Sequence, residues 1–210
     1  SENLRLRAHE EDALAHYAEE CTDVEYRFPF GWSELEGIAR RTDYDLGKHT
    51  EYSEARLQYF DEETKEKFIP YVVEPSGGVD RTLITFMVDA FEEETLVNAK
   101  GKEEKRTVLH FHPLIAPTTV AVFPLVRRDG MPDRAREIAA ALRDAGIRSF
   151  YDEKGAIGRR YRRQDEVGTP WCLTVDGQTA EDGTVTIRDR DTMAQERIPA
   201  GEAAPRIHER

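Results

Sequence analysis

The sequence of 210 residues predicts a mixed α/β (α+β) chain built from two parts. Short runs of alternating apolar and polar residues dominate the first part, whereas the second part alternates strands with helices. Pro113 and Pro117 separate the two, because prolines four residues apart cannot lie inside a helix or a central strand. We therefore place a domain boundary at 112–118, with one domain over residues 1–112 and another over residues 113–210.

The charge distribution changes at the same boundary. Residues 1–112 carry 26 Asp and Glu against 14 Lys and Arg, whereas residues 113–210 carry 16 of each, so the whole net charge of −12 lies in the first part. An acidic surface repels a polyanion. A nucleic acid is therefore expected to bind the second part.

The composition excludes several classes of protein. No stretch of the sequence is apolar for the roughly 18 residues that a membrane span requires, and the N-terminus lacks the pattern of a secretory signal. Cys21 and Cys172 are far apart and do not form a metal-binding pair, which predicts two reduced thiols. We expect a cytoplasmic protein without a membrane partner.

In the first part, hydrophobic periodicity predicts strands and helices that lead to one glycine-rich junction. The spacing predicts, in order, a helix over 9–20, a strand over 23–28, an ambiguous segment over 33–40, a hairpin within 44–68, a strand over 68–73, a helix over 82–94 and a strand over 107–112. The junction at 74–81 reads Glu-Pro-Ser-Gly-Gly-Val-Asp-Arg. Its glycines allow backbone to approach a ligand, Glu74 suits an ammonium group and Arg81 suits a phosphate. A plain strand-to-helix turn is an equal alternative.

In the second part, two strands flank a helix at the spacing of a βαβ unit, which favours parallel pairing. The pattern predicts strands over 120–123, 147–151, 171–175 and 184–188 and helices over 132–146 and 157–166, hence a small mixed sheet of about four strands. The tail from Pro199 shows no clear pattern.

The helix over 157–166 carries arginines that we expect on one exposed face, opposite Ile157, Tyr161 and Gln164. These are Arg159, Arg160, Arg162 and Arg163. Such a face can bind phosphates, or it can be a solvated surface paired with neighbouring acids. His110 and His112 have the alternation of a strand, but without an adjacent carboxylate or Cys they do not predict a metal site.

Several stretches of the sequence resemble one enzyme family. Residues 74–81 resemble motif 3 of class II aminoacyl-tRNA synthetases. Residues 26–46, with Phe-Pro-Phe-Gly-Trp-Ser-Glu-Leu-Glu-Gly, are similar to the segment before that motif in glycyl-tRNA synthetases of the dimeric type. Residues 112–117, 158–170 and 185–193 are similar to the anticodon-binding domain of the same enzymes. The resemblance covers about residues 3–198.

The resemblance implies ATP-dependent activation of glycine to glycyl-adenylate and its transfer to tRNA(Gly). It implies an antiparallel catalytic core in residues 1–112, a mixed-sheet anticodon-binding domain in 113–210, a homodimer, ATP and Mg²⁺ as cofactors and no DNA partner. The implied ATP-binding residues are Glu34, Leu35, Gly78, Val79, Asp80 and Arg81, with Glu34 also a magnesium ligand through the phosphates. The implied glycine-binding residues are Arg41, Glu74, Pro75, Ser76, Gly77 and Gly78. For tRNA we expect Arg159, Arg160, Arg163, Gln164 and Asp165.

Two further expectations follow from this resemblance. The family's motifs 1 and 2 are not found in residues 1–210 and the first methionine is Met87, so we expect a fragment that is inactive alone. The alternative is a non-catalytic, tRNA-binding accessory protein of synthetase ancestry. The matched acids and Arg81 favour the enzyme.

Overall fold

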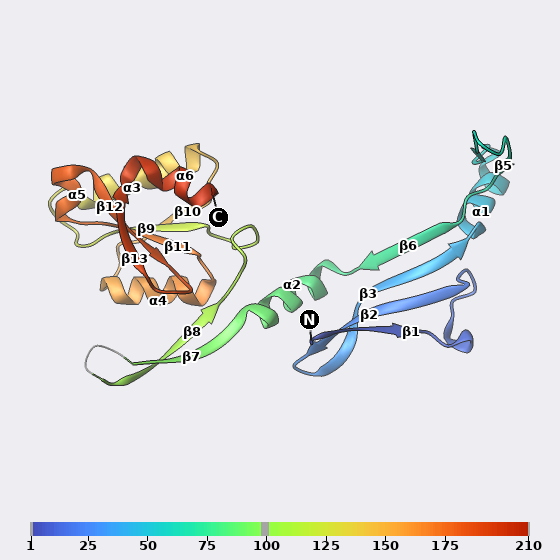
Figure 1. Cartoon of the computed structure of the whole chain (residues 1–210), viewed down its shortest axis with the longest axis horizontal. Coiled ribbons are helices and arrows are strands. Elements are labelled where there is room, and N and C mark those ends of the chain that lie inside the picture. The colour runs from blue at the N-terminus through green and yellow to red at the C-terminus, as the bar shows by residue number, and fades with distance from the viewer. Residues whose placement is uncertain (1, 98–100, 210) are drawn as a thin grey trace. The chain divides into compact units, whose positions relative to one another are not determined.

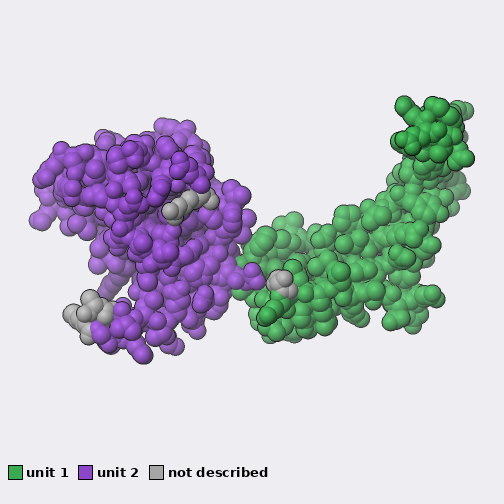
Figure 2. Space-filling view, viewed as in Figure 1, with its two compact units in different colours: residues 1–88 green, residues 89–210 purple. Residues whose placement is uncertain are grey.

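The computed structural model describes residues 2–97 and 101–209 and divides the chain into two compact units, Ser1–Val88 and Asp89–Arg210 (Figures 1 and 2). No helix in the described ranges is long and apolar enough to cross a membrane. The division between the units falls after Val88, before the boundary that we predict at 112–118. The predicted boundary separates functional domains, and it stays a prediction.

The first unit is built on one antiparallel sheet. Its strands are β1 (Leu4–Ala8), β2 (Glu20–Phe28), β3 (Gly31–Thr42) and β6 (Val72–Gly77), in the order β1-β2-β3-β6. A 3-10 helix η1 (Glu11–Ala13), helix α1 (Tyr44–Ser53) and the small hairpin of β4 (Tyr59–Phe60) and β5 (Lys67–Phe68) fill the connections. Helix α2 (Val79–Ala90) follows β6 directly (Figure 1).

Several boundaries in this unit differ from the sequence prediction. The helix expected over 9–20 is wrong, because only η1 forms and β2 already begins at Glu20. The ambiguous segment over 33–40 is part of β3. The strand expected over 68–73 instead runs from Val72 to Gly77. This strand, β6, lies at the edge of the sheet, so Pro75 costs it no sheet hydrogen bond on its outer side.

Helix α2 begins three residues before the predicted helix over 82–94 and ends four residues before it, because the chain leaves the helix after Ala90 to form a hairpin. This hairpin joins β7 (Phe91–Val97) to β8 (Glu103–Leu109) and belongs to the second unit. Residues 98–100 lie outside the described residues.

The second unit contains a five-stranded mixed sheet in the order β10-β9-β11-β12-β13. Its strands are β9 (Val120–Pro124), β10 (Ser149–Tyr151), β11 (Trp171–Val175), β12 (Thr184–Asp189) and β13 (Gln195–Pro199). Strand β9 is parallel to both β10 and β11, which confirms the predicted βαβ unit. The fifth strand, β13, was not predicted.

Helices cover both faces of this sheet (Figure 1). Helix α3 (Met131–Asp144) and helix α6 (Ala203–His208) pack on one face, where Val120, Leu173 and Val185 are completely buried. Helix α4 (Ile157–Val167) packs on the other face, against Phe123 and Cys172. Helix α5 (Gly177–Asp182) and a 3-10 helix η2 (Ala200–Glu202) complete the unit.

Gly168 ends helix α4 at a point where no other residue fits easily. Its φ of +80° is left-handed, and a Cβ there would lie 2.5 Å from a ring carbon of Phe111 and 2.9 Å from the carbonyl oxygen of Leu109. The glycine therefore lets α4 end against the segment that follows β8.

Candidate functional site

Sheet pairing brings together two segments of the first unit that the sequence analysis singled out, residues 26–46 and 74–81. Strands β3 and β6 are antiparallel, with Gly37 opposite Ser76 and Ala39 opposite Glu74. As a result, Glu34, Arg41, Glu74 and Ser76 line one pocket of about 360 Å³. Its other lining residues are His9, Ala13, Ala15, Tyr17, Ala18, Cys21, Asp23, Gly37 and Ala39.

Arg41 fixes one wall of this pocket. Its Nε and Nη2 atoms donate to both carboxylate oxygens of Asp45 at 2.6 and 2.7 Å, and its Nη1 donates to Glu74 Oε2 at 2.7 Å. The guanidinium also lies 4.0 Å from the ring centroid of Tyr17. The hydrogen bond with Asp45, and then the one with Glu74, raise the pKa of Arg41, so the cation is permanent. Arg41 is thereby held in place and orients Glu74.

Arg81, on α2, connects the start of the helix to β3. Its Nη1 donates to Ser33 Oγ at 2.9 Å and to the backbone carbonyl of Glu34. Gly78 directly precedes α2 and accepts a bond from the Thr82 hydroxyl at 2.9 Å. The structure therefore places Arg81 beside Glu34, whereas Gly78, Val79 and Asp80 are exposed at the start of the helix and do not line the pocket.

The remaining predicted residues of this unit lie in the sheet. Leu35 is half-buried on β3, Pro75 is opposite Ile38, and Gly77 is opposite Glu36. Gly37 leaves space between two carboxylates, since a Cβ there would lie 3.4 Å from Glu34 Oε1 and 3.6 Å from Asp23 Oδ1.

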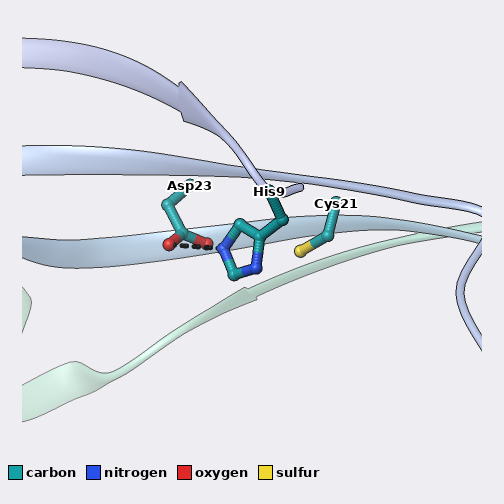
Figure 3. A group of neighbouring side chains, drawn as sticks. All are labelled: His9, Cys21 and Asp23. Carbon is teal, nitrogen blue, oxygen red and sulfur yellow. Dashed lines mark hydrogen bonds and ion pairs between the residues drawn. The ribbon is translucent and has the colours of Figure 1, made fainter. Parts of the chain in front are cut away.

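The sequence reasoning missed a trio on the pocket wall, His9, Cys21 and Asp23. Figure 3 shows the His9 imidazole between the Asp23 carboxylate and the Cys21 thiol, and its Nε2 lies 2.8 Å from Asp23 Oδ2. Burial, followed by the charges of Asp23 and Glu34, raises the pKa of the Cys21 thiol. Only the alternation of Cys21 and Asp23 along one strand could have indicated the pair.

His, Cys, Asp and Glu side chains that could hold a metal ion come together in two places among the described residues. His9, Cys21 and Asp23 form one group, and Glu92, Glu94 and His110 form the other, with ligand atoms within 4.8 Å of one another in each.

In the second unit, the predicted arginine face of α4 is wrong at one position. Arg160 is buried and donates to the carbonyl of Pro124 at 2.6 Å and to that of Leu125 at 3.2 Å. Burial lowers its pKa. Arg160 follows Ile157 by three residues and so lies on the same, inward side of the helix.

Gln164 and Asp165 are also buried, so neither of these expected tRNA contacts lies at the surface, and Gln164 lies on the inward side of α4 as its spacing predicts. Gln164 accepts from the Thr169 hydroxyl at 2.7 Å. Asp165 accepts from Arg188 at 2.8 and 3.1 Å and from Arg106 at 3.0 Å. Arg159 and Arg163 remain exposed, and Arg163 is paired with Asp152. Arg162 is half-buried and lies 3.8 Å from both Glu104 and Asp165.

Comparison with known families first defines the class of the second unit. Residues 119–210 match the family model described as an anticodon binding domain. The match spans the five-stranded sheet and its helices, so this sheet is similar to a domain of that class.

Similarity to whole proteins extends this result to nearly the full chain. The chain is 53% identical over 212 residues to a glycine–tRNA ligase of Thermobifida fusca, and all of the chain is covered. It is 52% identical over 197 residues to that of Clostridium perfringens and 50% identical over 212 residues to that of Geobacillus kaustophilus. The chain spans 42–46% of the length of these relatives. It is homologous to the C-terminal part of glycine–tRNA ligases.

Proposed function

We propose that this chain forms the C-terminal part of a glycine–tRNA ligase and supplies its glycine pocket, part of its ATP site and its anticodon-binding domain. The observation that carries the proposal is the pocket, because Glu34, Arg41, Glu74 and Ser76 come from two strands and line one small cavity. The homology to glycine–tRNA ligases covers the same residues.

The charges of the pocket suit glycine. Asp23, Glu34 and Glu74 offer three carboxylates to an ammonium group, while Arg41 provides the cation that orients Glu74. Glycine has no side chain to bind, so selectivity must come from recognising the bare ammonium and excluding bulk. Gly37 leaves space between the Asp23 and Glu34 carboxylates, and we assign the small substrate to this space.

We assign ATP and Mg²⁺ to the end of the site where helix α2 begins. ATP supplies the phosphorus that the glycine carboxylate attacks, and that reaction depends on positioned cations more than on a protein nucleophile. We assign Arg81 to the terminal phosphates, Leu35 and residues 78–80 to the nucleotide, and Glu34 to a magnesium ion held through the phosphates. Arg81 is already positioned for this role by Ser33.

The anticodon-binding domain is assigned to tRNA(Gly). Arg159 and Arg163 provide the exposed cations on α4 for its phosphates, with the half-buried Arg162 on the same helix. Contacts with phosphates do not depend on the RNA sequence. Arg160, Gln164 and Asp165 act inside the domain, where they shape that face. The enzyme is expected to be a cytoplasmic homodimer, as the family resemblance implies.

The first unit exposes an unusual amount of apolar surface, which supports its being part of a larger catalytic domain. In the described part of residues 1–88, Tyr26 and Phe28 are the buried apolar side chains. Large exposed ones include Leu6, Phe30, Val73, Val79, Leu83, Phe86 and Met87. Apolar patches of this kind mark surfaces that pack against other protein.

An aminoacylation assay tests the proposal. The ligase that contains this chain is expected to exchange pyrophosphate into ATP only with glycine and to charge tRNA(Gly). Binding of tRNA without any glycine-dependent exchange would contradict the proposal and favour the non-catalytic accessory protein.

A further inference from the structure

A second cluster of metal-ligand side chains lies in the second unit. Glu92 and Glu94 are two residues apart and therefore project from the same side of β7. His110 follows the end of β8, where its amide donates to the carbonyl of Ala90 at 2.7 Å. This backbone bond places its ring beside the two acids.

Two distances in this cluster match those between neighbouring ligands of a zinc ion. His110 Nε2 lies 3.4 Å from Glu92 Oε2 and 3.4 Å from Glu94 Oε1. Around a tetrahedral zinc with bonds of about 2.0–2.1 Å, neighbouring ligand atoms lie about 3.4 Å apart. The Nε2 atom is buried and makes no hydrogen bond within the described residues.

The groups behind these ligands are also arranged as in a metal site. Asp191 Oδ1 lies 2.7 Å from the other ring nitrogen of His110, Nδ1. Such a carboxylate fixes the tautomer that leaves Nε2 free to bind a metal and makes the ring a stronger ligand. Asp191 is itself held by two bonds from Arg190, at 2.6 and 2.9 Å, and Arg106 donates to Glu94 Oε2 at 2.7 Å.

We propose that Glu92, Glu94 and His110 bind a zinc ion, with Asp191 orienting the histidine. The three side chains leave a fourth position for water. Zinc would link β7 to the end of β8 and, through Asp191, to the turn after β12. The sequence prediction dismissed His110 for want of a carboxylate, because Glu92 and Glu94 are distant in sequence and only the hairpin brings them close.

The competing explanation is a protonated His110 paired with acids, and one substitution separates the two. His110→Lys keeps a positive charge beside Glu92 and Glu94 but removes the imidazole. Zinc uptake by the full chain is measured by competition with a chromophoric chelator. The wild type is expected to bind one zinc ion more than His110→Lys or than the Glu92→Gln, Glu94→Gln double variant.

Two further variants control this experiment. Cys21→Ser alters the other donor group and is expected to keep the zinc ion assigned to His110. Asp191→Asn keeps all three ligands but is expected to weaken zinc affinity about 10- to 100-fold, as outer-sphere partners of metal histidines do. Circular dichroism of each metal-free variant confirms that it folds.

Thermal unfolding gives a second readout. Zinc is expected to raise the Tm of the wild type and not that of His110→Lys, because a ligand that binds only the native state stabilises it. Equal zinc uptake by wild type and His110→Lys, or no uptake by either, would overturn the proposal.

Discussion

The Arg41 guanidinium donates to Glu74 Oε2 at 2.7 Å across 33 residues of sequence, and this bond joins the end of β3 to β6. The same guanidinium binds both oxygens of Asp45. Arg41 thus sets the position of the carboxylate that we assign to the ammonium of glycine.

Arg41→Lys is expected to raise the KM for glycine by tenfold or more while leaving the KM for ATP nearly unchanged. Lysine has no planar fork and cannot bind Asp45 and Glu74 together. Hydrogen bonds to charged groups contribute about 1.5–3 kcal/mol each. Pyrophosphate exchange at varied glycine and ATP measures both constants.

The matched control is Arg40→Lys. Arg40 is adjacent in sequence but pairs with Glu19 and Glu20, both well exposed. Equal effects of the two substitutions on glycine would show that Arg41 does not position the pocket.

Gly37→Ala is expected to impair glycine binding without unfolding the protein. The added methyl group would contact Glu34 at 3.4 Å and Asp23 at 3.6 Å, which is ordinary van der Waals contact but occupies space between the carboxylates. The KM for glycine should rise, while the free energy of unfolding should change by less than about 1 kcal/mol. Gly47→Ala, where a Cβ meets nothing within 4 Å, is the control. A glycine KM unaffected by Gly37→Ala would place the substrate elsewhere.

Charge on the outer face of α4 is expected to govern tRNA affinity. Arg159→Ala with Arg163→Ala should weaken tRNA binding and reduce the slope of log affinity against log salt by about one unit for each lost phosphate contact. Titration at two salt concentrations measures this. Unchanged affinity and slope would leave these arginines as a solvated surface, as the pairing of Arg163 with Asp152 already allows.

Asp165→Asn is expected to destabilise the second unit by about 3–5 kcal/mol, because Arg106 and Arg188 would remain buried without their carboxylate. Burial acts to lower the pKa of Arg106, but the bonds with Asp165 and Glu94 outweigh it and hold that pKa above its ordinary value. Asp133→Asn removes an exposed pair with Arg136 and should cost less than about 1 kcal/mol. Denaturant unfolding compares them, and similar losses would contradict a structural role for Asp165.

Local sequence pattern predicted the second unit better than the first. Strands β9 and β11 and helix α4 agree with their hydrophobic periodicity because each packs an apolar side on the sheet. The segment over 9–20 has helical composition, but its ring contacts override that preference, since Tyr17 lies against Arg41 and His16 against Tyr44. Helix α6 was missed because only Ala203 and Ile207 mark its buried side.

The residues of the candidate site were likewise predicted only in part. Motif order predicted Glu34, Arg41, Glu74 and Ser76, which the structure brings together. It could not identify His9 or Asp23, because their contact depends on strand register.

Glycine kinetics of Glu74→Gln tests the central claim most directly. Glutamine keeps the size of the side chain and removes the charge that we assign to the ammonium of glycine. In the ligase that contains this chain, we predict a glycine KM raised about 10- to 100-fold, in keeping with the loss of roughly 1.5–3 kcal/mol, and an ATP KM close to that of the wild type. An unchanged KM for glycine together with an unchanged kcat would contradict the account.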